Sequence, residues 1–145
     1  MILRELTIAY RPTDPKVQAP RGKVETPAAA AGILVPLLKD QAQEVFVIVL
    51  LNTKRQIIAV HEISRGGLTS VDVSPRLIVR AALLTDATGL ILAHNHPSGD
   101  PAPSQEDIAL TRRVRDCAQL FEIPVLDHII VGNDRYTSLK EYGIL

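Results

Sequence analysis

The sequence predicts a single α/β domain, α/β or α+β in class, built on a mixed sheet flanked by helices. Segments rich in β-branched residues alternate along the chain with segments that carry helix start signals, as in folds whose strands and helices interleave. The chain has 145 residues, of which 46% are hydrophobic, and this suits one compact domain with its own core.

The N-terminal segment is predicted to lie outside this domain. Residues 1–25 carry three prolines and mixed polarity, so they are expected to form an arm or linker, with one short strand in ILRELTIAY. The domain itself is predicted to span residues 26–145.

Helix start signals and apolar runs predict the first elements of the domain. Thr26 is a favourable N-cap and Pro27 a favourable first helical residue, so a helix is expected there, bent or shortened at Pro36. EVFVIVLLN is rich in β-branched residues and predicts a buried strand. QIIAVHEIS follows it across NTKR, at the spacing of a hairpin.

The second half of the chain repeats this alternation. A Ser-Pro start predicts a helix in SPRLIVRAALLTDA, and SQEDIALTRRVRDCAQLFEI predicts another helix of about five turns. Strands are predicted in GLILAHNH and VLDHIIVG, and a short helix is expected in SLKEYGIL at the end of the chain.

Composition excludes several classes of protein. The formal net charge is +0, so the chain as a whole has no electrostatic preference for nucleic acid or for an anionic membrane. Cys117 is the only cysteine, which excludes an intramolecular disulfide and a Cys-rich zinc knuckle and is typical of a reducing compartment. The N-terminus lacks a signal-peptide pattern, and the longest apolar run is too short to cross a bilayer, so we expect a cytoplasmic protein.

The segment LAHNHPSGDPAPSQED predicts a metal site. His94 and His96 end a predicted strand, in which side chains two residues apart point to the same face. A turn rich in proline and glycine follows, and Asp107 falls in the first turn of the next helix, from which its carboxylate can reach the same point. Two imidazoles and one carboxylate are a common zinc set, and three protein ligands with an open position are typical of catalytic zinc. We therefore predict one zinc ion per chain.

A zinc site that activates water also needs a base. Glu44 stands at the start of the first buried strand, where an acid is otherwise out of place, and it is the first candidate. Glu62, in the second strand of the hairpin, is the alternative. Either carboxylate would take a proton from the water and return it to the leaving amine.

Structural explanations compete with the metal site. Ser104 and Asp107 have the spacing of a capping box, which accounts for both without a metal, and the two histidines could be ordinary polar residues at a strand end. The occurrence of all these groups in one short segment favours the metal site. Ser104 can serve both roles, because a hydroxyl that accepts a hydrogen bond from the helix backbone can still donate its hydrogen to an oxyanion.

The spacing Glu…His-x-His-(seven residues)-Ser-x-x-Asp resembles the JAMM motif of the JAB/MPN+ metalloproteases. The segment HNHPSGDPAPSQED, followed by LDHIIVG, is similar to the RadC-type branch of this family. The resemblance covers about residues 25–145. It implies a JAB/MPN-like (cytidine-deaminase-like) sheet flanked by helices and a glutamate base, for which Glu44 is the looser match. It also implies that His94, His96 and Asp107 hold the zinc ion. Ser104 would then donate a hydrogen bond to the oxyanion.

The leading prediction of function is a zinc-dependent hydrolase of amide bonds, a peptidase or isopeptidase acting on a peptide or protein. One alternative is an accessory protein of DNA repair or recombination that processes or binds nucleic acid. Longer RadC-type chains carry an N-terminal helix-hairpin-helix region that residues 1–25 are too short to hold, which weakens the carry-over of DNA binding to this chain. The other alternative is a catalytically silent interaction module that zinc stabilises.

Two further groups of polar residues have more than one interpretation. Asp127 and His128 enter a predicted buried strand, where they would either hydrogen-bond to the zinc ligands or form an ordinary polar pair. Arg112, Arg113 and Arg115 lie on one predicted helix, and a solvated helix face is favoured over a phosphate site.

Overall fold

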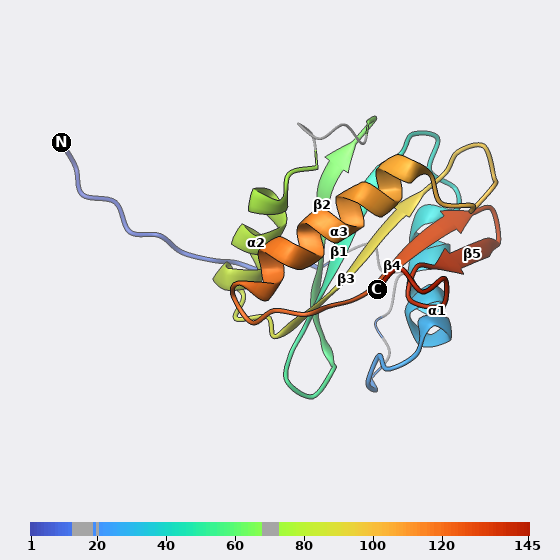
Figure 1. Cartoon of the computed structure of the whole chain (residues 1–145). Helices are drawn as coiled ribbons and strands as arrows, with labels where there is room; N and C mark the ends of the chain where they lie inside the picture. The colour runs from blue at the N-terminus through green and yellow to red at the C-terminus, as the bar shows by residue number, and fades with distance from the viewer. Residues whose placement is uncertain (13–18, 20, 68–72) are drawn as a thin grey trace.

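The computed structural model describes residues 1–12, 19, 21–67 and 73–145 of the chain. In this part of the chain, helices and strands alternate as shown in Figure 1. The elements are α1 (Pro27–Leu38), β1 (Val45–Leu51), β2 (Ile57–Arg65), α2 (Pro75–Leu84), β3 (Gly89–Asn95), α3 (Gln105–Gln119), β4 (Val125–Gly132) and β5 (Arg135–Ser138).

The strands form one mixed sheet in the order β2-β1-β3-β4-β5. The β1–β2, β1–β3 and β4–β5 pairs are antiparallel, and β3 and β4 are parallel. The parallel pair needs a crossover connection, which α3 supplies. The predicted mixed sheet flanked by helices is therefore confirmed.

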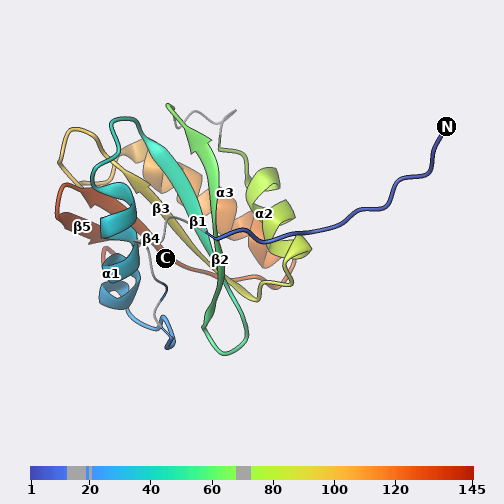
Figure 2. The ribbon, with the colours of Figure 1, turned by 180° about the vertical axis from the view of Figure 1, so that it is seen from behind.

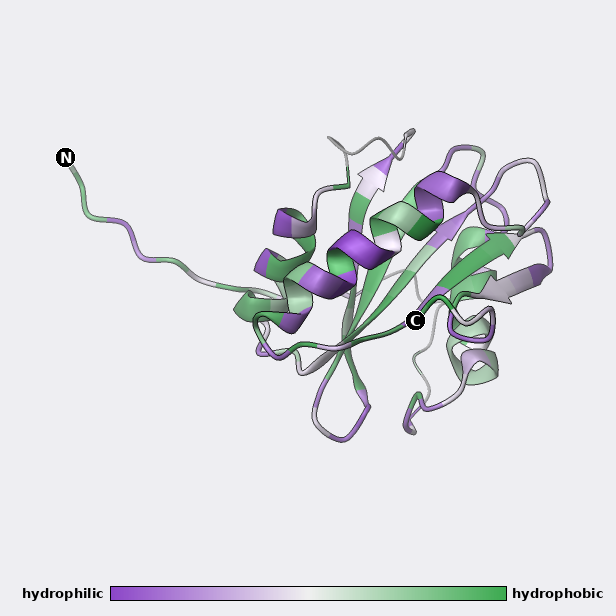
Figure 3. Ribbon diagram, in the orientation of Figure 1, coloured by the Kyte–Doolittle hydropathy of each residue, from purple (hydrophilic) through white to green (hydrophobic). Residues whose placement is uncertain are grey.

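Helices cover both faces of the sheet. In Figure 1, α2 and α3 lie on the face toward the viewer, and Figure 2 shows α1 on the opposite face. The hydrophobic colouring of Figure 3 is concentrated on the strands between these layers. The central strands β1 and β3 are accordingly buried along their whole length.

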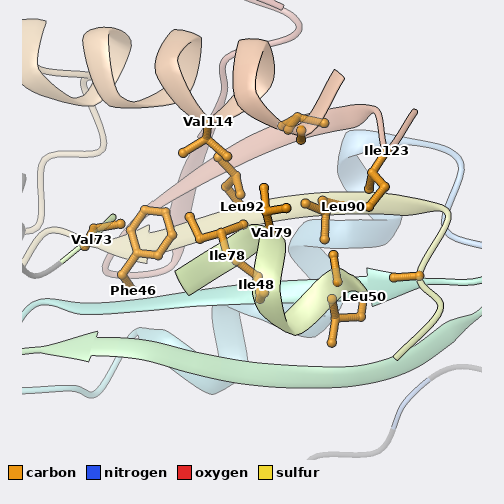
Figure 4. Close-up of a cluster of buried hydrophobic side chains, with 14 of the residues drawn as sticks. Phe46, Ile48, Leu50, Val73, Ile78, Val79, Leu90, Leu92, Val114 and Ile123 are labelled. Atoms are coloured by element: carbon orange, nitrogen blue, oxygen red, sulfur yellow. The ribbon is translucent and has the colours of Figure 1, made fainter. Parts of the chain in front are cut away.

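The two faces of β1 contribute to two different cores. Phe46, Ile48 and Leu50 pack with residues of α2 and α3, as Figure 4 shows. Val47 and Val49 pack instead with α1. Because successive strand residues point to opposite faces, Glu44 lies on the same face of the sheet as Phe46.

Three residues that the sequence marks as helix starts are N-caps. The side chains of Thr26, Ser74 and Ser104 accept hydrogen bonds from the backbone of the first turns of α1, α2 and α3. Pro36 lies inside α1 and does not end it, since the helix continues to Leu38.

Two predicted elements are wrong. Residues 1–12 form no strand, because a strand needs a partner for its backbone hydrogen bonds and this segment pairs with none among the described residues. At the other end, the expected helix in SLKEYGIL is replaced by β5, which ends at Ser138, and by turns after it. Eight residues are too few to offset the cost of helix nucleation without strong packing.

Candidate metal centre

Two imidazoles and a carboxylate meet where β3 ends and α3 begins. His94 is the penultimate residue of β3, and His96 follows the strand directly, held by a 2.8 Å bond from its N–H to the carbonyl of Val131 in β4. The chain then turns through Gly99, whose φ of +86° suits glycine, and enters α3. Asp107 is the third residue of that helix, so its side chain points back toward the histidines.

The atoms that face each other in this cluster are potential metal ligands. Nε2 of His94 lies 3.0 Å from Nε2 of His96. The two carboxylate oxygens of Asp107 lie 3.2 Å from Nε2 of His94 and 3.3 Å from Nε2 of His96. A tetrahedral zinc ion with bonds of about 2.0–2.1 Å would separate its ligand atoms by about 3.3 Å. The spacing of the cluster therefore fits such an ion.

The protonation of His96 also fits a cation at this point. Nδ1 of His96 lies 2.8 Å from the carbonyl oxygen of Asp100. A carbonyl only accepts hydrogen bonds, so Nδ1 carries a hydrogen, and in the neutral ring Nε2 then presents its lone pair to the cluster. A lone pair facing another ring nitrogen and a carboxylate at 3.0–3.3 Å is stabilised by a positive ion between them.

Asp107 is both a helix cap and a candidate ligand. Its Oδ2 accepts a hydrogen bond of 2.8 Å from the backbone N–H of Ser104, while the Ser104 hydroxyl accepts one of 3.1 Å from the N–H of Asp107. This capping box aims Oδ1 at His94. Burial raises the pKa of Asp107, but the hydrogen bond with His94, the attraction of a protonated His94 and the hydrogen bonds with Ser104 together outweigh burial and hold this pKa well below its usual range.

Glu44, the residue before β1, also lies close to the two histidines. Its carboxylate and ring nitrogens of His94 and His96 lie within 4.8 Å of one another. Asp107 is closer to both histidines, which favours Asp107 as the third ligand and Glu44 as the outer carboxylate. Glu62 is on the other face of the sheet, where it lines a groove against α1 and pairs with Arg65 at 2.6 Å.

Asn95, between the two histidines, places the backbone around Glu44. Its side chain points to the opposite face and is buried. Oδ1 of Asn95 accepts a 2.7 Å hydrogen bond from the N–H of Val45, and Nδ2 donates one of 2.9 Å to the carbonyl of Gln43. Both backbone neighbours of Glu44 are thus held by Asn95. Sequence reasoning missed this residue, although an asparagine at the end of an apolar strand is a signal of such a contact.

Of the two adjacent polar residues Asp127 and His128 in the first half of β4, one reaches the cluster. Nε2 of His128 lies 2.8 Å from Nδ1 of His94, and both rings are fully buried. Burial holds the pKa of His128 well below its usual range, and a charge on His94 would lower it further, so the buried site favours a neutral ring. Asp127 pairs along the sheet with Ile91 on the α1 face and accepts hydrogen bonds from Ser138 and from the backbone of Lys140. Asp127 also accepts a 2.7 Å hydrogen bond from the backbone N–H of His128, but it does not reach His94 or His96.

The remaining residues that the sequence analysis singled out lie on α3 or at its start. Ser104 is exposed at the start of α3, next to the cluster. Arg112 and Arg113 are exposed on α3, and Arg115 pairs with its neighbour Asp116 at 2.9 Å. The described part of the chain contains no helix that is both long and apolar enough to cross a membrane.

Comparison with known proteins gives a consistent set of relatives. Residues 24–144 match the family model described as RadC-like JAB domain. A protein of Clostridium beijerinckii named UPF0758 is 40% identical over 123 residues, which cover 85% of this chain and 54% of the relative. The UPF0758 protein of Salinibacter ruber is 44% identical over 128 residues, or 88% of this chain and 55% of the relative.

The relatives are longer proteins. The UPF0758 protein of Desulforudis audaxviator, 46% identical over 121 residues, matches 83% of this chain and 53% of its own length. This chain thus spans about half the length of these curated relatives. The family model nevertheless covers the whole sheet, its three helices and the His94, His96 and Asp107 cluster. The chain therefore belongs to the RadC-like JAB domain family.

Proposed function

We propose that this chain is a zinc-dependent hydrolase that cleaves peptide or isopeptide bonds. The observation that carries the proposal is the convergence of two imidazole nitrogens and a carboxylate within 3.3 Å, with a second carboxylate nearby. A cluster of this kind matches catalytic zinc sites with three protein ligands. The proposed ligands are His94, His96 and Asp107, for one zinc ion per chain.

Glu44 is the proposed general base and acid. When bound, zinc supplies Lewis acidity and lowers the pKa of a coordinated water. The Glu44 carboxylate, half-buried at the start of β1, would accept the proton of the attacking water and deliver it to the amine that leaves. Its place is set by the backbone around it, which Asn95 holds.

Ser104 is the proposed donor to the oxyanion. Its hydroxyl uses one lone pair to accept from the N–H of Asp107, and the hydroxyl hydrogen remains available to a ligand beside the metal. The exposure of Ser104 leaves that side of the cluster open to a substrate.

The alternatives have less support. A two-metal nuclease holds its ions about 3.5–4 Å apart between several carboxylates. Within the described ranges, a single group of metal-ligating side chains is found. A catalytically silent module would not need a carboxylate beside the candidate ligands, which is where Glu44 lies. The proposal also includes a peptide or protein as the substrate and the cytoplasm as the location.

A metal-dependent activity screen tests the proposal. Purified protein is assayed for metal content and then screened on peptides, isopeptide-linked peptides and DNA, with and without a chelator. We expect zinc, and amide cleavage that the chelator abolishes and zinc restores. The Glu44→Gln variant is the matched control and should keep zinc but lose turnover. Chelator-sensitive cleavage of DNA alone, or a protein that binds no metal, would overturn the proposal.

A further inference from the structure

A buried chain of hydrogen bonds runs behind the candidate ligands. The Thr111 hydroxyl lies 2.6 Å from the backbone carbonyl of Asp107 and 2.6 Å from Nδ1 of His128. Nε2 of His128 lies 2.8 Å from Nδ1 of His94. All three side chains, those of Thr111, His128 and His94, are fully buried. The chain of contacts thus begins at the backbone of Asp107 and ends at the ring that faces the Asp107 carboxylate.

The direction of each hydrogen bond follows from the first one. The carbonyl of Asp107 can only accept, so the single hydrogen of the Thr111 hydroxyl points to it. If that hydrogen pointed to His128 instead, two oxygens 2.6 Å apart would face each other with no hydrogen between them. The Thr111 oxygen therefore accepts, and Nδ1 of His128 donates.

The same logic continues to the candidate ligand. A neutral His128 with its hydrogen on Nδ1 has a lone pair on Nε2, and full burial favours the neutral ring. Nδ1 of His94 must then carry the hydrogen of the 2.8 Å bond between the rings. In the neutral form of His94, which is the form that binds a metal, the remaining nitrogen Nε2 then carries a lone pair that faces His96 and Asp107.

We propose that Thr111 and His128 are positioning residues that set the tautomer of His94, so that its Nε2 is always the nitrogen offered to a metal ion. The inference rests on the proposed metal centre and deepens it. One turn of α3 performs two tasks, since Asp107 supplies a carboxylate and Thr111, four residues later on the same face, starts the chain of hydrogen bonds. His128 connects them from β4, the parallel neighbour of β3.

The alternative is that Thr111 and His128 are only satisfied core polar groups. A threonine hydroxyl bonded to the carbonyl four residues back is common in helices and has no need of a histidine. Under that alternative, their removal lowers stability but leaves the His94 tautomer and the metal affinity unchanged. The two explanations therefore predict different results for the same variants.

The test reads the tautomers directly by NMR of protein with 15N-labelled histidine, without metal and with Zn²⁺. In the parent we expect hydrogen on Nδ1 and a lone pair on Nε2 in His128, and Nδ1–H in zinc-loaded His94. Thr111→Val keeps the size of the side chain and removes the hydroxyl. It should remove the preference of His128 for Nδ1–H and weaken zinc binding by about 10–100-fold in a chelator competition.

Thr111→Ser is the matched control, because it keeps the hydroxyl. It should restore the parental tautomers and zinc affinity even if it melts earlier than the parent. His128→Phe, a buried ring without nitrogens, should weaken zinc binding like Thr111→Val. A parent in which His128 carries its hydrogen on Nε2 would overturn the inference, as would a folded Thr111→Val variant with parental tautomers and affinity. A parent with the expected tautomers that binds no zinc would instead overturn the proposed function.

Discussion

At the residue scale, one carboxylate of Asp107 is both a helix cap and a candidate metal ligand. One oxygen accepts from the N–H of Ser104 and caps α3, and the other faces His94. The capping box and the candidate metal site, which compete as explanations of the sequence, are therefore geometrically compatible and share the same carboxylate. The cap orients the carboxylate, and its low pKa keeps the carboxylate ionised.

The first prediction concerns the metal. We expect about one zinc per chain in the purified protein, because the cluster offers one set of three ligands. His96→Ala should lose most of this zinc, as measured by elemental analysis after gel filtration. Full zinc occupancy in the His94→Ala, His96→Ala double variant would show that the metal is bound elsewhere.

The second prediction separates the two glutamates. Glu44→Gln keeps the size of the side chain but cannot accept a proton, so zinc should stay while turnover falls by about 10²–10⁴-fold. Glu62→Gln is the matched control, since Glu62 lies on the α1 face and its loss should leave turnover unchanged. Parental activity in Glu44→Gln together with an inactive Glu62→Gln would contradict the assignment.

The third prediction distinguishes the two roles of Ser104. Ser104→Asp keeps an N-cap acceptor but cannot donate to an oxyanion, so it should be about as stable as the parent, bind zinc and turn over substrate at least about 10²-fold more slowly. Ser104→Ala should also lose about 0.5–2 kcal/mol of unfolding free energy in a denaturant titration. Parental turnover in Ser104→Asp would mean that the serine is only a cap.

At the element scale, the site exists because three element ends meet. β3 ends at Asn95, α3 begins at Gln105, and β1 begins at Val45 beside Glu44. The parallel β3–α3–β4 unit brings the helix N-terminus over the end of β3 and places His128 behind His94. Asn95 ties the start of β1 to the same strand end.

The fourth prediction tests this tie. Asn95→Ala removes the buried bonds to the backbone on both sides of Glu44, so we expect a loss of about 1–3 kcal/mol in unfolding free energy and a fall in turnover. Zinc affinity should change little, because His94 and His96 keep their positions. Gln43→Ala is the control, since only the backbone carbonyl of Gln43 takes part. Parental turnover in a folded Asn95→Ala variant would contradict the role of Asn95.

At the scale of the whole molecule, one sheet joins two apolar cores. Leu92 lies in the core under α2 and α3, and Leu34 in the core under α1, and both are fully buried. Both cores share β1 and β3, so neither face can lose its packing without disturbing the other. This coupling holds the candidate site, at one end of the sheet, in a fixed frame.

The fifth prediction follows from this coupling. Leu92→Ala and Leu34→Ala should each lower the unfolding free energy by about 2–5 kcal/mol, because each leaves a cavity in a packed core. Urea unfolding followed by circular dichroism should show a single transition in both variants. Separate transitions for the two layers would show that the cores are independent.

The sequence by itself determined the local features of this protein. Helix starts at Thr26, Ser74 and Ser104 and the central strands follow from caps and apolar runs, which act over a few residues. The candidate ligands could be named for the same reason, because His94, His96 and Asp107 fall within one strand–turn–helix segment. The missed β5 strand had a weak local signal, the Asn133-Asp134 turn after β4.

Only the tertiary structure decided which distant groups join that segment. Glu44, and not Glu62, lies beside the histidines. The register shift between β1 and β2 pairs Glu62 with Val47, whose side chain points to the α1 face. The inclusion of His128 and the exclusion of Asp127 depend on the pairing of β4 with β3, since adjacent strand residues point to opposite faces. Strand order and register arise from packing across the whole sheet, and no short stretch of sequence contains them.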